Sequence, residues 1–91
     1  MSKEEGQFVL DVDASNWAAG AVLQQYQDGV LKVIAYSSRM FNDCELKYCI
    51  TRKELAAMIF GLKQYRQYLL GRKFLVRSDH AAYNILDQRK N

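Results

Sequence analysis

The chain has 91 residues, of which 49% are hydrophobic and 25% charged, and this is typical of one small globular domain, residues 1–91. No apolar stretch approaches the roughly 20 residues that span a membrane, so we expect a soluble intracellular protein with no membrane partner. Cys44 and Cys49 have no partners spaced for a zinc site. Residues 1–31 carry one basic and five acidic side chains, whereas residues 32–91 carry twelve basic and five acidic ones, an excess that can attract a polyanion or simply solvate a helix face.

Three strands are predicted in the first forty residues. Residues 7–13 are rich in Phe, Val and Leu on both faces, which is typical of an inner strand of a sheet. Residues 18–25 and 30–37 read as two further strands, and Gln27-Asp28-Gly29 between them is a hairpin signal. We therefore expect an antiparallel meander.

A long helix is predicted after the polar connection at residues 38–50. Thr51-Arg52-Lys53-Glu54 matches the capping-box pattern, so the helix should run from 52 to about 70 and stop at Gly71. Its apolar stripe would consist of Leu55, Met58, Ile59, Leu62 and Leu69.

A fourth strand is predicted at residues 73–79, and residues 81–88 resemble the start of a second helix. The order is then β-β-β-α-β-α, an α/β fold in which the long helix allows the fourth strand to lie parallel to the first. With no strand after it, the fourth strand would leave an exposed sheet edge and favour self-association.

Three acidic residues stand where elements of this fold begin or end. Asp13 and Asp79 close the first and fourth strands, and Glu54 lies in the first turn of the helix. If the two strands are parallel neighbours, all three carboxylates reach one edge, where they suit one or two Mg²⁺ or Mn²⁺ ions. Each acid also has a plainer role, as a turn cap, a capping-box partner or a solvated strand end. Asp11 competes with Asp13, because both lie on one face of the strand.

At these residues the chain resembles the RNase H domain of gypsy-type retrotransposon reverse transcriptases. The resemblance runs from about Phe8 to Leu86. It is carried by residues 8–15 (FVLDVDAS), 20–24 (GAVLQ), 34–39 (IAYSSR), 53–58 (KELAAM), 68–71 (YLLG) and 74–80 (FLVRSDH).

The resemblance implies an RNase H-like fold and metal-dependent hydrolysis of the RNA strand of an RNA–DNA hybrid. It places the family's acidic ligands on Asp13, Glu54 and Asp79, and it implies a polyprotein that also carries the polymerase domain, in a cytoplasmic virus-like particle or in the nucleus. Lys63, Arg66 and Arg72 are candidates for phosphate contacts. His80 matches a motif histidine that we interpret as structural.

The chain also departs from the family pattern. Ala18 replaces a frequent glycine, and Arg52 a frequent acid. The family's fifth strand, final helix and fourth carboxylate would follow residue 91, so the sheet is expected to be truncated before its fifth strand, and Asp87 falls in the wrong segment to replace the missing acid. The alternative function is therefore a catalytically silent scaffold or nucleic-acid-binding module. A sugar-kinase-like phosphotransferase lacks the glycine-rich phosphate loop it would need.

Overall fold

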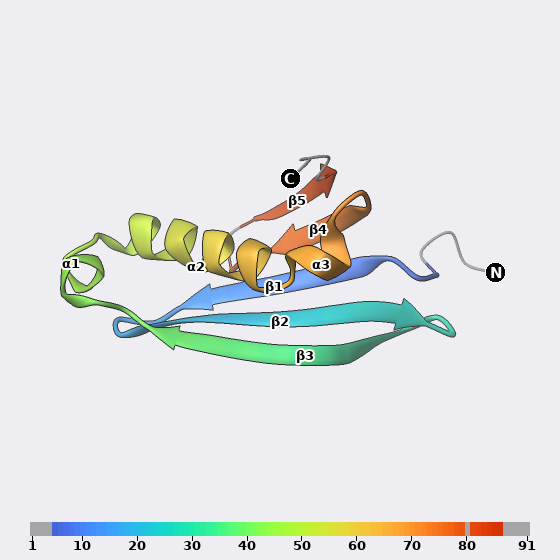
Figure 1. Ribbon diagram of the computed structural model, residues 1–91, viewed down its shortest axis with the longest axis horizontal. Coiled ribbons are helices and arrows are strands. Elements are labelled where there is room, and N and C mark those ends of the chain that lie inside the picture. Colours follow the sequence, from blue (N-terminus) through green and yellow to red (C-terminus); the bar gives the residue numbers. More distant parts are fainter. Residues whose placement is uncertain (1–4, 80, 87–91) are drawn as a thin grey trace.

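The computed structural model describes residues 5–79 and 81–86, and over these ranges the chain forms one five-stranded sheet and three helices (Figure 1). The elements are β1 (Phe8–Ala14), β2 (Ala18–Gln27), β3 (Val30–Met40), α1 (Asp43–Leu46), α2 (Ile50–Gln64), α3 (Arg66–Leu69), β4 (Lys73–Arg77) and β5 (Ala82–Leu86). No helix in the described ranges is both long enough and apolar enough to cross a membrane.

The strand order across the sheet is β3-β2-β1-β4-β5. The pairs β1–β2, β2–β3 and β4–β5 are antiparallel, and β1 and β4 are parallel. The meander, its hairpin turn and the parallel fourth strand are therefore confirmed. Asp28 and Gly29 both have positive φ (55° and 78°), as the two central residues of a tight hairpin turn require.

The prediction of a helix at residues 81–88 is wrong where the structure describes them. Ala82–Leu86 forms β5, so the sheet is not truncated before its fifth strand. Tyr83 pairs with Val76 and Ile85 with Phe74, and Ile85 packs against the core. Pairing with β4 decides this segment over its local helical pattern. Because β5 covers β4, the sheet ends in β3 and β5 among the described strands, and the exposed edge expected at the fourth strand is absent.

The helix bounds also differ from the prediction. Cys49 is the N-cap and makes no side-chain capping hydrogen bond, and the helix begins at Ile50, so Thr51 lies inside it and cannot cap it. At the other end Tyr65 leaves the helical region (φ −111°, ψ 21°), which separates α2 from α3. The segment predicted as a polar connection contains the end of β3 and all of α1.

The apolar stripe predicted for this helix is confirmed only in part: Met58 and Leu62 pack against the core, and Leu69 is buried in α3. Leu55 and Ile59 are 54% and 45% exposed, and the buried residues are Lys53, Ala57 and Gly61. These three recur every four residues and so share one face. Small side chains at two of them let the helix lie close to the sheet. A Cβ added at Gly61 would stand 3.1 Å from Val12 Cγ1.

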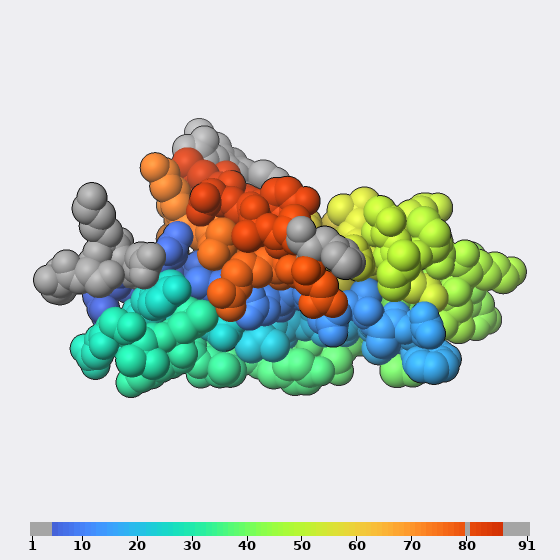
Figure 2. All heavy atoms as spheres, turned by 180° about the vertical axis from the view of Figure 1, so that it is seen from behind, coloured from blue at the N-terminus to red at the C-terminus, as the bar shows by residue number. Residues whose placement is uncertain are grey.

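The core therefore lies between α2 and one face of the sheet, with Leu10, Val12 and Val76 among its residues. Along β1 the side chains alternate, so Asp11 and Asp13 point to the opposite face. Figure 2 shows the molecule from that side, where atoms of the strands make up most of the surface. The acids that end β1 thus belong to a face that α2 leaves open.

Candidate acidic site

A hollow of about 550 Å³ lies on this open face, around the carboxyl ends of β1 and β4. Asp13 and Asp79 both line it, and both side chains are exposed. The parallel register of β1 and β4 sets Asp11 beside Arg77. Asp13 comes two residues after Asp11, and Asp79 comes two residues after Arg77. The predicted proximity of these two strand ends is therefore seen in the fold.

Asp11 lines the same hollow but is already engaged. Arg77 Nε and Nη2 donate to its two carboxylate oxygens at 2.6 and 2.8 Å, and Gln24 Nε2 donates at 2.8 Å. Burial acts to raise the pKa of Asp11, but the Arg77 and Gln24 hydrogen bonds and the Arg77 charge together hold that pKa below its ordinary value. Asp11 thus stays ionised, with its charge balanced within the sheet.

Asp13 stands at the start of a tightly bonded loop. Its Oδ1 accepts a hydrogen bond from the Ala14 backbone N–H at 2.9 Å. Ser15 Oγ accepts from the backbone N–H groups of Trp17 and Ala18 at 3.2 and 3.0 Å, which closes the turn into β2. Trp17 at the tip of this loop is 62% exposed.

Glu54 comes from the helical layer rather than from the sheet. It lies in the early part of α2, which packs on β1 and β2, and in Figure 1 these first turns lie toward the end of the molecule where β1 terminates. Its side chain is partly buried, and it is not among the residues that line the hollow.

The donors fit a hard divalent cation only in part. Carboxylate oxygens such as those of Asp13 and Asp79 are the ligands that Mg²⁺ takes. Across residues 5–79 and 81–86, however, no three acidic, Cys or His side chains are grouped so that they could hold one ion. The structure thus brings two of the predicted ligands to one hollow, and the three-acid metal site stays a prediction.

Lys53 is a residue of this region that the sequence interpretation missed. It is the buried charged side chain among the described residues, at 7% exposure, and its Nζ donates to the Asn16 backbone carbonyl at 3.0 Å. This bond joins α2 to the loop after Asp13. The signal was the spacing of Lys53, Ala57 and Gly61, which places all three on one helix face.

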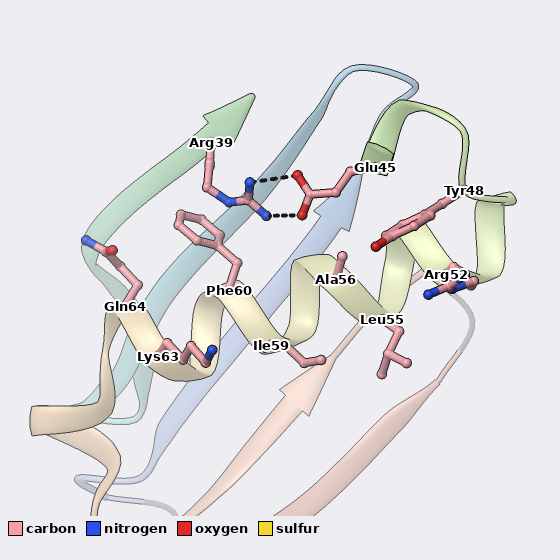
Figure 3. A pocket seen from close by; sticks show the side chains of 10 residues that line it. All are labelled: Arg39, Glu45, Tyr48, Arg52, Leu55, Ala56, Ile59, Phe60, Lys63 and Gln64. Carbon is pink, nitrogen blue, oxygen red and sulfur yellow. Dashed lines mark hydrogen bonds and ion pairs between the residues drawn. The ribbon is translucent and has the colours of Figure 1, made fainter. Parts of the chain in front are cut away.

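The predicted phosphate-binding residues lie elsewhere. Lys63 lines a second hollow of about 560 Å³ between α2 and the end of β3, together with Arg39 and Phe60 (Figure 3). Lys63 and Arg66 line a smaller one, and the Arg72 guanidinium carbon lies 5.4 Å from the centroid of the Phe8 ring. None of the three predicted cations lines the acidic hollow. His80 and Asp87 lie outside the described residues.

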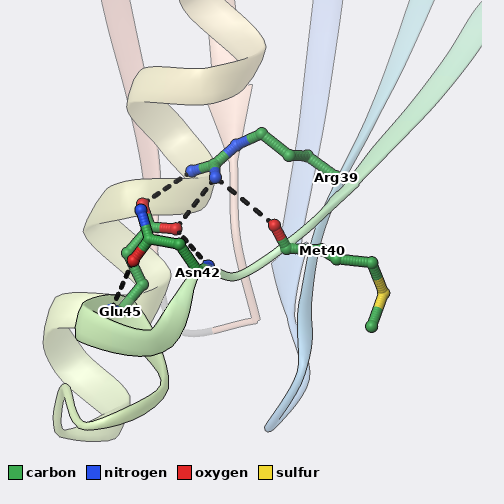
Figure 4. A network of polar contacts seen from close by, with 4 residues as sticks. All are labelled: Arg39, Met40, Asn42 and Glu45. Atoms are coloured by element: carbon green, nitrogen blue, oxygen red, sulfur yellow. Dashed lines mark hydrogen bonds and ion pairs between the residues drawn. The ribbon is translucent and has the colours of Figure 1, made fainter.

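The second hollow is bounded by a polar network that fixes α1 (Figure 4). Asn42 Oδ1 accepts from the Glu45 N–H, and Glu45 Oε1 accepts from the Asn42 N–H, both at 2.9 Å, a reciprocal capping box. Arg39 donates to both Glu45 carboxylate oxygens at 2.8 Å. The Arg39 and Asn42 hydrogen bonds lower the pKa of Glu45 to about 2.

Comparison with known proteins places this arrangement in a family. Residues 3–91 match the family model described as the RNase H-like domain found in reverse transcriptase. The chain is 50% identical over 76 residues to the retrovirus-related Pol polyprotein from transposon 297 of Drosophila melanogaster, covering 84% of this chain and 7% of that protein. It is 46% identical over 74 residues to the Pol polyprotein from transposon opus of the same organism, covering 80% of this chain and 7% of that protein. The chain thus spans less than a tenth of the length of these curated relatives.

Solved structures agree with the sequence matches. A foamy viral protease-reverse transcriptase in complex with an RNA/DNA hybrid matches with a TM-score of 0.66 and 31% identity, over 82% of this chain and 10% of that one. A structure of the foamy viral protease-reverse transcriptase in complex with dsDNA matches with a TM-score of 0.65 and 28% identity, over 86% of this chain and 16% of that one. The mixed sheet, with β1 parallel to β4, is an RNase H-like fold. The chain belongs to the RNase H-like domain family found in reverse transcriptases.

Proposed function

We propose that this domain binds an RNA–DNA hybrid and hydrolyses its RNA strand with the help of Mg²⁺ or Mn²⁺. The observation that carries the proposal is the convergence of Asp13 and Asp79, from parallel strands, on one hollow of an RNase H-like domain. Asp13, Glu54 and Asp79 are the proposed ligands of two such ions. The chain would act within a reverse transcriptase polyprotein, beside the polymerase domain.

The charges around the hollow support this assignment. Asp11 is balanced by Arg77, so it adds no free negative charge to the hollow. Asp13 and Asp79 are exposed acids, so their oxygens are accessible to a cation that could also bind a phosphate group of the substrate. When bound, two divalent ions would supply a water activated for attack and a stabilised leaving oxygen. The protein's part is to hold the carboxylates in place and to keep the hybrid over the hollow.

The binding partner is proposed from the structural neighbours and from the charge of the chain. The foamy viral relatives were solved with an RNA/DNA hybrid and with dsDNA. Residues 32–91 carry an excess of basic side chains, which favours a polyanion. Because Lys63, Arg66 and Arg72 lie away from the acidic hollow, their contribution would be to bind the duplex at a distance from the cleaved bond.

The test is cleavage of an end-labelled RNA–DNA hybrid by the 91-residue chain in Mg²⁺ and in Mn²⁺. Asp13→Asn and Asp79→Asn should each lower the cleavage rate by at least about 100-fold. Loss of a residue that only orients a metal ligand costs up to about 100-fold, and here a proposed ligand itself is lost. Asp28→Asn is the matched control, because Asp28 is an exposed acid in the β2–β3 turn. Product formation unchanged by Asp13→Asn would refute the proposal.

A second candidate function is a catalytically silent module that binds hybrid. The observation in its favour is that no three metal-binding side chains are grouped for one ion within the described ranges. Such a module would bind hybrid with an affinity that falls steeply with salt, yet form no product in either metal. Binding together with cleavage that depends on Asp13 would exclude it.

A further inference from the structure

Lys53 is a buried lysine whose surroundings need an explanation. Its side chain is 7% exposed, although a buried ammonium group is costly unless it is well partnered. The ion pairs Arg39–Glu45 and Arg77–Asp11 do not include Lys53. The Lys53 ammonium instead meets a backbone carbonyl, that of Asn16, at 3.0 Å, and the ring of Phe41, whose centroid is 5.9 Å away.

The carbonyl that Lys53 binds lies in the loop that follows Asp13. The next carbonyl along this loop, that of Trp17, accepts a hydrogen bond from the Phe41 backbone N–H at 2.7 Å. Two successive loop carbonyls are therefore held from outside the loop, one by α2 and one by the residue that follows β3. The Ser15 hydroxyl closes the same loop from within. The turn after Asp13 is thus anchored on several sides.

The Lys53 bond joins the two segments that carry proposed ligands from different layers of the fold. Lys53 immediately precedes Glu54 on α2, and Asn16 is the third residue after Asp13. Because catalytic geometry tolerates displacements of only a fraction of an ångström, a tie at this point affects whether the two carboxylates can serve one site. An apolar side chain could fill the same space but could not hold the loop carbonyl.

We propose that Lys53 is a positioning residue, which fixes the loop after Asp13 against α2 and so sets the separation of Asp13 from Glu54. The proposal rests on the proposed function, because it assumes that the two acids act in one metal site. Lys53 itself contacts neither the metal nor the hybrid in this account. It acts through its hydrogen bond to the Asn16 carbonyl.

The test compares Lys53→Met, which keeps the length of the stem but removes the donor, with Lys53→Arg, which keeps a cationic donor. Lys32→Met is the matched control at an exposed position of β3. The loop is followed by the backbone amide signals of Asn16 and Trp17, and by the indole signal of Trp17, the one tryptophan of the chain. Affinity for Mg²⁺ is followed in the same titration.

We expect Lys53→Met to shift the loop signals and to weaken Mg²⁺ binding by about 10- to 100-fold, the usual effect of losing a group that orients a ligand. Lys53→Arg should recover most of the affinity, and Lys32→Met should behave as the unmodified chain. A folded Lys53→Met variant with unchanged loop signals and unchanged affinity would overturn the proposal.

Two further outcomes keep the test decisive. If Lys53→Met does not fold, Lys53→Arg decides: loop signals and Mg²⁺ affinity that are both kept support the proposal, whereas a displaced loop with unaltered affinity, or a loss of affinity with the loop in place, overturns it. If the unmodified chain binds no Mg²⁺, the proposed function fails, and with it the claim that Lys53 serves a metal site. The Asn16 and Trp17 signals still show separately whether Lys53 holds the loop.

Discussion

Replacing Gly61 by alanine tests how closely α2 packs on the sheet, and thus the layer distance on which the acidic site depends. The added Cβ would stand 3.1 Å from Ala21 Cβ, 3.1 Å from Val12 Cγ1 and 3.2 Å from Leu10 Cδ2. Carbon atoms prefer separations of about 3.5–4.0 Å, so all three contacts are too short by a few tenths of an ångström. All three neighbours are buried in the core, which limits how far they can move.

The expected magnitude is the difference of two terms. Overpacking of a core costs about 1–3 kcal/mol. Alanine in a helix interior is favoured over glycine by about 1 kcal/mol. The net loss of unfolding free energy should therefore be about 1 kcal/mol, which lowers the melting temperature of a domain this size by about 4–8 °C. Gly61→Val should cost clearly more, because its larger β-branched side chain adds to the clash and is less favoured in a helix.

Urea unfolding followed by circular dichroism measures this difference. The gain from alanine over glycine is calibrated at Ile59, which is 45% exposed on the same helix, by comparing Ile59→Ala with Ile59→Gly. If Gly61→Ala were more stable than the unmodified chain by the full calibrated gain, α2 would not lie as close to β1 and β2 as the structure places it.

Three further predictions concern the two polar networks. Asn42→Ala should lower the unfolding free energy by about 1 kcal/mol, because it removes one half of the capping box, and an unchanged urea midpoint would contradict this. The pKa of Glu45 is lowered from 4.5 to about 2. Its contribution to stability is therefore complete above pH 4.5 and is lost as the pH falls through 2. Glu45→Gln should make the unfolding free energy depend less on pH over that window. Arg77→Met should raise the pKa of Asp11, followed by NMR, because burial then acts with less opposition. Arg77→Met should lower the unfolding free energy by no more than about 1 kcal/mol, because the Asp11 and Arg77 side chains are 37% and 40% exposed. A larger loss would contradict this degree of exposure.

Much of the sheet was predictable because its signals are local. The apolar content of the first strand and the turn signal at Gln27-Asp28-Gly29 predicted the meander, and the structure confirms it. A long helix before the fourth strand permits the parallel pairing that brings Asp13 and Asp79 to one edge. Both acids were found because each stands at the end of a strand-like run.

The last strand and part of the buried helix face were missed for a different reason. The segment 82–86 has a local pattern that favours a helix, and its strand form depends on pairing with β4. On α2 the larger apolar side chains drew the predicted stripe toward Leu55 and Ile59, whereas close packing selects the small residues Ala57 and Gly61. The face of α2 that packs on the sheet also includes Lys53, whose hydrogen-bond partner Asn16 lies 37 residues away in the sequence. Contacts of that kind cannot be deduced from spacing alone.

The capping pattern shows how a correct rule can select a wrong position. Thr51 and Glu54 match the box, but so do Asn42 and Glu45, and the structure forms the second pair. Arg39 adds two hydrogen bonds to Glu45, which strengthens that choice. The two pairs belong to different helices, and Thr51 forms no cap because α2 already begins at Ile50.

The central claim is that Asp13, Glu54 and Asp79 bind divalent metal together. A Mg²⁺ titration of the isotopically labelled chain, followed through the backbone and side-chain signals of these residues, tests it most directly. We expect saturable shifts centred on all three, which Asp13→Asn abolishes and Asp28→Asn leaves intact. Shifts that never saturate, or that leave Glu54 unmoved while Asp13 and Asp79 respond, would contradict a shared three-acid site.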